Sequence, residues 1–272
     1  MSHSAELSFV IATARAAGAL IREHYGRVER QTKRGEEAVT EADRASQRLI
    51  IERLAQRFPD DGVIGEENDD GSAITNRPPK RGTRTWVIDP LDGTNNFVAG
   101  LGNFAVCIGL LSEGMPILGV VYDVCRDEVF AAEHGHGAWR NDQAIHAPTT
   151  PLSERCLLML TSNMLDAHGA MPTWAAAFHA QTRLKIRVLG SAALEAVQVA
   201  AGAAHGSITV NGKLWDIAAA AAIVLEAGGV LTTPQNGPFF PIMLTGYAGA
   251  KTPYVVAGKA AHGELIDAIK RR

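Results

Sequence analysis

The sequence predicts a layered α/β fold made of two halves. Residues 1–150 contain two helical patterns followed by a succession of strand patterns, which is typical of an α+β half with an antiparallel sheet. Residues 151–272 alternate strand and helix patterns, which is typical of an α/β half. The length of 272 residues allows one large domain or two closely packed ones.

Two helices are expected near the N-terminus, over residues 5–25 and 41–58. In the first, apolar residues recur at the spacing that places them on one helix face, and Gly26 is suited to end the helix. Thr40 is the expected N-cap of the second, with Asp43 three residues further on. Asp43 can therefore be a helix-capping residue alone.

Residues 68–84 are polar and rich in Pro and Gly, and are expected to form a loop. Short strands separated by turns are expected to follow this loop. Turns such as Glu113-Gly114 predict an antiparallel meander, whereas the second half should alternate strands with helices. The strands expected in the first half are 85–88, 104–111, 117–124, 128–132 and 138–140. The second half should contain strands 156–161, 184–189, 206–210, 229–232 and 253–257, and helices 173–181, 191–202, 216–227 and 259–270.

Charge and composition exclude several classes of protein. The formal net charge of −3 provides no basic field for nucleic acid. The longest uncharged run, residues 95–112, contains Asn and Gly residues and is not a membrane span. The N-terminus lacks the apolar core of a signal peptide, and Cys107 and Cys125 are expected to be buried free thiols. We therefore expect a cytoplasmic protein that binds neither nucleic acid nor membranes.

The most informative segment is residues 86–97, Trp-Val-Ile-Asp-Pro-Leu-Asp-Gly-Thr-Asn-Asn-Phe. The proline after Asp89 excludes the α conformation there, so we expect the strand to end with Asp89 and Asp92 at a rigid corner. Two carboxylates this close repel each other unless a cation lies between them. The N–H groups of Gly93 and Thr94, at the start of a helical turn, suit an anion. The corner therefore suggests metal-assisted phosphate chemistry.

The same corner can also be a plain turn, because Asp-Pro and Asp-Gly are ordinary turn dipeptides. The haloacid-dehalogenase phosphatases have a D-x-D-G-T corner, but its aspartates are two residues apart and these are three apart. Two further acidic residues, Glu66 and Asp216, are also ordinary when each is taken alone. Glu66 can be a surface carboxylate, and Asp216 can be a helix N-cap.

Taken together, Gly65-Glu66-Glu67, the Asp89–Thr94 corner and Trp215-Asp216 resemble the inositol monophosphatase family of magnesium-dependent, lithium-sensitive phosphatases. The resemblance covers about residues 5–270. It implies an alternating five-layer αβαβα sandwich with the active site between the two halves. It also implies hydrolysis of a small phosphate monoester by a metal-activated water. Further segments that resemble the family are 39–43, 135–141, 190–193 and 226–229.

The resemblance implies two or three Mg²⁺ ions, which Mn²⁺ can replace. Asp89 is expected to bridge two of the ions. A ligand set made only of oxygen atoms favours these metals over zinc. The expected metal ligands are the carboxylates of Glu66, Asp89, Asp92 and Asp216 and the carbonyl oxygen of Leu91.

Catalytic roles are implied for Thr94, Asp43 and Glu66. Thr94 is expected to accept a hydrogen bond from the attacking water and to be polarised by Asp43, whereas Glu66 also helps to hold a third ion. Lys33 is a further candidate near the phosphate. The expected substrate contacts are Gly93, Thr94, Asp92, Gly190, Ser191, Ala192, Thr209 and Asp216.

Inositol 1-phosphate is the first candidate substrate, with histidinol phosphate and fructose 1,6-bisphosphate as alternatives. Inositol-selective relatives carry a glutamate seven residues before the Trp-Asp aspartate, where this chain has Thr209. A non-enzymatic binding or regulatory role predicts lost ligands, and none is lost. The family also suggests a homodimer, for which apolar residues in 95–111 and 156–164 are candidate contacts.

Overall fold

The structure is a computed structural model in which seven stretches of the chain are described. Thr40, the expected N-cap, and the side chain of Lys33 lie outside the described part. The stretches are residues 3–26, 31–33, 37–39, 41–67, 73–165, 169–181 and 184–270.

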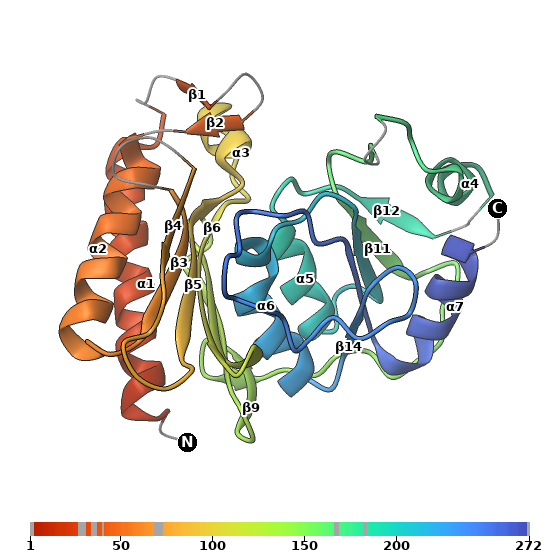
Figure 1. Cartoon of the computed structure of the whole chain (residues 1–272). Coiled ribbons are helices and arrows are strands. Elements are labelled where there is room, and N and C mark those ends of the chain that lie inside the picture. Colours follow the sequence, from red (N-terminus) through yellow and green to blue (C-terminus); the bar gives the residue numbers. More distant parts are fainter. Residues whose placement is uncertain are drawn as a thin grey trace.

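Helices and sheets alternate in five layers, as the resemblance implied (Figure 1). One pair of helices packs on the outer face of the first sheet and a second pair lies between the two sheets. The last pair packs on the outer face of the second sheet. In this order the pairs are α1 (Ala5–His24) with α2 (Glu41–Arg57), α5 (Ala192–Ala200) with α6 (Leu214–Glu226), and α4 (Thr173–Gln181) with α7 (Lys259–Lys270).

The first sheet has the order β10-β9-β8-β7-β6-β5-β3-β4, and consecutive strands from β5 to β10 pair antiparallel, which confirms the meander. β3 pairs parallel with β5, so the sheet is mixed. The expectation of a plain loop over 68–84 was wrong, because β4 forms there and pairs antiparallel with β3. The strands are β3 (Gly62–Glu67), β4 (Ala73–Arg77), β5 (Thr85–Asp92), β6 (Ala105–Ser112), β7 (Met115–Asp123), β8 (Glu128–Glu133), β9 (Gly137–Arg140) and β10 (Gln143–Ala144).

The second sheet has the order β12-β11-β13-β15-β14. β11 is parallel to both of its neighbours, whereas β15 runs antiparallel to β13 and β14. The alternation of strands and helices expected after residue 150 is confirmed. The strands are β11 (Leu157–Leu160), β12 (Lys185–Arg187), β13 (Gly206–Thr209), β14 (Val230–Thr232) and β15 (Tyr254–Ala257); a separate hairpin is formed by β1 (Gln31–Lys33) and β2 (Glu37–Val39).

Glycines in the first sheet allow α6 to approach its backbone closely. A Cβ added to Gly109 would lie 2.8 Å from the backbone nitrogen of Ala219, and one on Gly119 would also collide with Ala219. The alanine-rich face of α6 therefore rests directly on β6 and β7. Since Asp216 lies in the first turn of α6, this contact brings that carboxylate to the first sheet. The proposed division at residue 150 falls between β10 and β11 and stays a prediction.

The strands expected to supply a dimer contact lie inside the protein. β6 has both faces covered, because its alternate side chains belong to the cores on either side of the sheet. In β11, the last three residues are buried. Of the segments 95–111 and 156–164, only flanking residues such as Leu101 and Ser162 are exposed.

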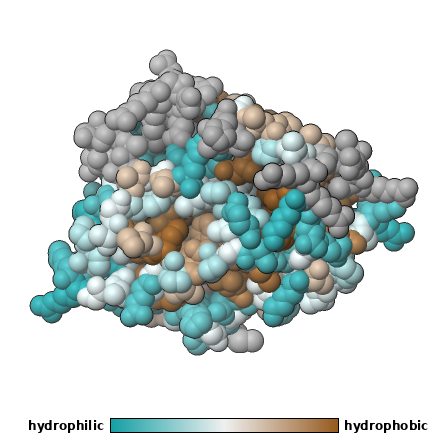
Figure 2. Space-filling view, turned by 45° about the vertical axis from the view of Figure 1, so that its right-hand side comes forward, coloured by the Kyte–Doolittle hydropathy of each residue, from teal (hydrophilic) through white to brown (hydrophobic). Residues whose placement is uncertain are grey.

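The cysteines are free thiols, as expected, but Cys125 is exposed, because it lies in the turn after β7 rather than in a strand. No helix in the described ranges combines the length and the apolar character that a bilayer crossing requires. Figure 2 shows a face on which hydrophilic residues predominate, with smaller hydrophobic areas between them.

Candidate active site

The Asp-Pro-Leu-Asp corner is part of a strand rather than the end of one. β5 continues through Pro90 to Asp92, and its register with β6 shifts between Asp89 and Asp92. The expectation that the strand ends at Asp89 was therefore wrong, because an irregularity in the ladder accommodates a proline that cannot donate a hydrogen bond. Both carboxylates are buried, with Asp89 1% and Asp92 7% exposed.

Gly93 and Thr94 turn the chain from β5 into a short helix, α3 (Thr94–Val98), as expected. Gly93 has φ 95°, and a Cβ there would lie 2.9 Å from the carbonyl oxygen of Asn103. The position therefore requires glycine. The tight turn places the Thr94 hydroxyl beside the carbonyl oxygen of Leu91, to which it donates at 3.0 Å.

The same hydroxyl also donates to Asp43, at 3.3 Å. Asp43 lies in the first turn of α2 and is 1% exposed. The structure therefore brings together Thr94 and Asp43, which are 51 positions apart and which the family resemblance implied would interact. With its own hydrogen directed to these acceptors, the Thr94 oxygen keeps its lone pairs available for another donor.

Asp92 is anchored to the opposite half of the chain. Its carboxylate accepts hydrogen bonds from the Ser191 hydroxyl at 2.5 Å and from the backbone N–H groups of Ala192 and Ala193 at 3.2 and 2.8 Å. Ser191 is the N-cap of α5, and its hydroxyl also accepts a hydrogen bond from Leu194 N–H. Asp92 thus receives donors at the positive end of a helix.

Asp216 lies at the third position of α6, so the alternative in which it is the N-cap is wrong. Its carboxylate accepts a hydrogen bond of 2.9 Å from the backbone N–H of Lys213. Glu66 lies near the end of β3. These residues come from a strand and a helix that are far apart in the sequence, and the packing of α6 on the first sheet brings them to one region.

The four carboxylates interact strongly. Burial raises the pKa of Asp89 well above its usual value, and the charges of Glu66, Asp92 and Asp216 raise it further. Burial likewise raises the pKa of Asp216, with added repulsion from Asp92 and Glu66. Burial raises the pKa of Asp92 to about 6, although hydrogen bonds from Ser191 and α5 oppose the increase.

These residues fit a hard divalent cation, which would replace their mutual repulsion by attraction. The donor set contains only carboxylate oxygens and the Leu91 carbonyl. In the described ranges, no three His, Cys, Asp or Glu side chains already have the arrangement of an assembled metal centre.

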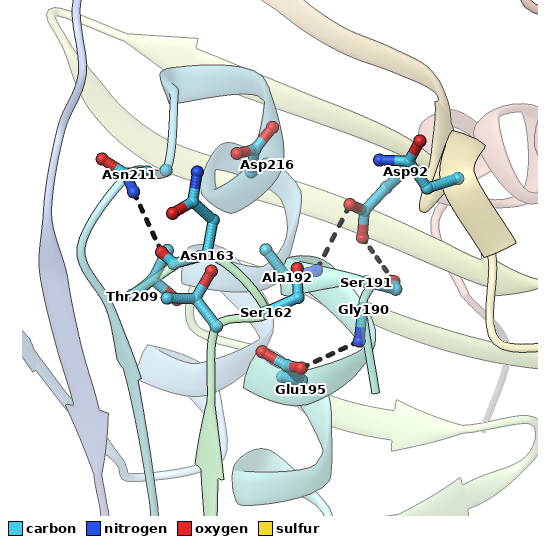
Figure 3. A pocket seen from close by; sticks show the side chains of 13 residues that line it. Asp92, Ser162, Asn163, Gly190, Ser191, Ala192, Glu195, Thr209, Asn211 and Asp216 are labelled. Atoms are coloured by element: carbon cyan, nitrogen blue, oxygen red, sulfur yellow. Dashed lines mark hydrogen bonds between the residues drawn. The ribbon is translucent and has the colours of Figure 1, made fainter. Parts of the chain in front are cut away.

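A pocket of about 230 Å³ lies beside Asp92 and Asp216 (Figure 3). Its lining combines carboxylates with neutral hydroxyl and amide groups, and none of the lining residues that the structure describes is a Lys or Arg. Six of the eight expected substrate contacts line the pocket, and Gly93 and Thr94 do not. The lining residues are Asp92, Asn95, Thr161, Ser162, Asn163, Gly190, Ser191, Ala192, Glu195, Thr209, Asn211, Gly212 and Asp216.

Several of these residues were not predicted from the sequence, and Glu195 is the most notable of them. It is the one charged residue of α5 and is 1% exposed. Burial raises its pKa to about 8. A lone glutamate within an otherwise uncharged helix was the sequence signal that could have identified it. Asn211 gave no such signal; its amide holds the carbonyl groups of Asn163 and Leu165 at the pocket rim.

Comparison with known proteins agrees with this geometry. The model of the inositol monophosphatase family matches residues 3–271. The fructose-1,6-bisphosphatase/inositol-1-monophosphatase of Thermotoga maritima is 37% identical over 228 residues, which cover 83% of this chain and 84% of the relative. Nus factor SuhB of Escherichia coli is 33% identical, covering 97% and 98% of the two chains. The crystal structure of the extragenic suppressor protein suhB from Bartonella henselae superposes with a TM-score of 0.87 at 30% identity, covering 98% and 99%.

Proposed function

The chain belongs to the inositol monophosphatase family, and we propose that it hydrolyses a small phosphate monoester, with inositol 1-phosphate as the first candidate. The observation that carries this proposal is the cluster of acidic residues beside a polar pocket, in which burial and neighbouring charges raise the pKa of Asp89 and Asp216. Such an arrangement is costly for stability and is typical of functional sites.

Glu66, Asp89, Asp92, Asp216 and the Leu91 carbonyl would hold Mg²⁺. When bound, the ion would neutralise charge on the phosphate and lower the pKa of a bound water. We propose that two or three Mg²⁺ ions bind and that Mn²⁺ can replace Mg²⁺. The N–H groups of Gly93 and Thr94 would add hydrogen bonds to the phosphate oxygens.

The chain's own contribution to the attack is the orientation of water. Because the Thr94 hydroxyl donates to Leu91 and Asp43, its oxygen is left to accept a hydrogen bond from the attacking water. Asp43 fixes this direction from a buried position in α2. Orientation of this kind makes a large contribution when the protein forms no covalent intermediate.

The pocket supports a leaving group that is polar and uncharged. Hydroxyl and amide side chains such as Ser162, Asn163 and Asn211 suit the hydroxyl groups of a polyol. Among the described residues that line the pocket, none is a Lys or Arg that could pair with a second phosphate. This favours a monophosphate over fructose 1,6-bisphosphate, although the name of the Thermotoga relative keeps that substrate as an alternative. Histidinol phosphate also stays an alternative.

The name Nus factor, borne by the Escherichia coli relative, motivates a second candidate function as a binding or regulatory protein. The two functions are separable, because only the phosphatase requires the carboxylates. We favour the phosphatase since the full set of acidic residues is present. We also propose, from the family resemblance, a cytoplasmic homodimer that is inhibited by Li⁺. Sedimentation velocity at micromolar concentration tests the dimer.

Phosphate release from a panel of monoesters tests the function. Hydrolysis should require Mg²⁺, return with Mn²⁺ after chelation, and not be supported by Ca²⁺, which tolerates irregular coordination and would misplace the water. The panel contains inositol 1-phosphate, histidinol phosphate, fructose 1,6-bisphosphate and 2-glycerophosphate. Full activity in excess chelator would refute the metal-dependent mechanism.

A further inference from the structure

The turn that presents Ser191 to Asp92 is held by two side chains. The amide nitrogen of Asn96 donates to the carbonyl oxygen of Leu189 at 2.7 Å. The Oε1 atom of Glu195 accepts hydrogen bonds from the backbone N–H groups of Leu189 and Gly190 at 2.8 and 3.1 Å. Both polar groups of the Leu189 backbone are therefore bound by side chains.

Gly190 leaves this turn little freedom. Its φ of +76° favours glycine, and a Cβ there would lie 2.9 Å from the amide nitrogen of Asn96. Asn96 also donates to the carbonyl oxygen of Asn103 at 2.8 Å, so its side chain is itself fixed. The turn is thus clamped between α3 of the first half and α5 of the second.

Glu195 is a costly residue to bury for packing alone. Its Oε2 atom has no hydrogen-bond partner among the described residues, and burying an unpaired polar atom reduces stability. Figure 3 shows one carboxyl oxygen of Glu195 bonded to Gly190 and the other turned away from it. An apolar side chain would avoid this cost but would leave two N–H groups of the turn without their acceptor.

We propose that Glu195 is a positioning residue that sets the affinity for the divalent cation, by holding the Leu189–Gly190 turn in the conformation in which Ser191 and the start of α5 orient the Asp92 carboxylate. The inference rests on the proposed function, in which Asp92 is a metal ligand. Residues that orient a metal ligand without touching the metal commonly change its affinity about 10- to 100-fold.

The chain offers a conservative variant and a matched control. Glu195→Gln keeps an oxygen that can accept from both N–H groups, whereas Glu195→Leu removes it. Glu226 performs the same kind of loop holding elsewhere, since its carboxylate accepts from Gly135 N–H and Gly137 N–H at 3.0 and 2.9 Å. Because Glu226 ends α6, ten residues from Asp216, it lies roughly 15 Å along the helix from that carboxylate.

Isothermal titration of chelator-stripped protein with MgCl₂, without substrate, tests the inference. Glu195→Leu should weaken Mg²⁺ binding at least about 10-fold, with Glu195→Gln within about threefold of wild type and Glu226→Leu unchanged. Ca²⁺ binding should weaken less than Mg²⁺ binding, because Ca²⁺ accepts irregular geometry. A general loss of stability would not discriminate between the two ions in this way.

Two results would overturn the inference: a folded Glu195→Leu protein that binds Mg²⁺ like the wild type or more tightly, or a Glu195→Gln protein as weak as Glu195→Leu. Circular dichroism establishes folding. If Glu195→Leu does not fold, Asn96→Ala releases the same turn from its other side and should also weaken Mg²⁺ binding. Wild-type protein that binds no Mg²⁺ would instead refute the metal-dependent function itself.

Discussion

The Asp92 carboxylate and the Ser191 hydroxyl, which are 99 positions apart, form a hydrogen bond of 2.5 Å between β5 and the N-cap of α5. This bond links the strand that carries the Asp-Pro-Leu-Asp corner to the helix layer between the two sheets. It also stabilises the ionised form of Asp92, in opposition to burial. The position of one proposed metal ligand therefore depends on the packing of the second half of the chain.

Asp89→Asn and Asp216→Asn should each lower kcat by about 10³-fold or more, since several kcal/mol of charge stabilisation is lost. Folding should survive, because each change removes a carboxylate that its neighbours repel. An asparagine at 216 can still accept the hydrogen bond from Lys213 N–H. Steady-state kinetics and thermal unfolding measure both effects. If Asp216→Asn retained near-normal turnover, the Asp216 side chain would only stabilise the start of α6.

Thr94→Ala should lower kcat with little change in KM, because Thr94 orients water rather than substrate. Asp43→Asn should have a similar but milder effect, since an asparagine oxygen can still accept from Thr94. If the two residues act as a unit, the double variant should be no slower than Thr94→Ala alone. Strictly additive losses would show that Asp43 only stabilises the start of α2.

Thr209→Glu should raise selectivity for inositol 1-phosphate over 2-glycerophosphate. A glutamate can accept hydrogen bonds from polyol hydroxyls, and one such bond, worth roughly 1.5–3 kcal/mol, corresponds to an expected gain of about 10- to 100-fold. Thr209 lines the pocket but is 1% exposed, so the folded state of the variant needs checking by circular dichroism. The readout is kcat/KM for both substrates and both proteins. A wild-type preference for inositol 1-phosphate above about 10³-fold, which would be about 4 kcal/mol, would place recognition elsewhere.

Glu195→Gln should change how stability depends on pH. Burial raises the pKa of Glu195 from 4.5 to about 8, so between these values the unfolded chain has released a proton that the folded chain retains. Wild-type stability should therefore fall as the pH rises through this window, at roughly 1.4 kcal/mol per pKa unit. Glutamine removes this titration.

Urea denaturation across this pH range measures the difference. The free energies of unfolding of the two proteins should be similar near pH 4.5, and Glu195→Gln should be more stable by several kcal/mol at pH 8, given roughly 1.4 kcal/mol per pKa unit. Glu226→Gln serves as the control, because it replaces a loop-holding carboxylate near the protein surface. The same pH dependence in wild type and Glu195→Gln would contradict the buried, protonated state of this group.

The order and type of most elements could be predicted from the amino-acid sequence, because hydrophobic period and turn residues are local properties. The sequence also identified Asp89, Asp92 and the turn at Gly93, since a proline and a glycine restrict the backbone at those positions. β4 could not be predicted from the sequence, because most of its residues are polar and the strand is stabilised by pairing with β3. The continuation of β5 through Pro90 likewise depends on its pairing with β6.

The placement of the carboxylates and the contacts that hold them depend on tertiary packing and could not be predicted from local patterns. The helical pattern suggested that Asp216 begins a helix, but α6 starts two residues earlier, at Leu214. The anchoring of Asp92 on α5 and the clamp formed by Asn96 and Glu195 join residues that are distant in the sequence. Local patterns record which conformation a segment favours, whereas these contacts depend on which segments are packed together when the two sheets enclose α5 and α6.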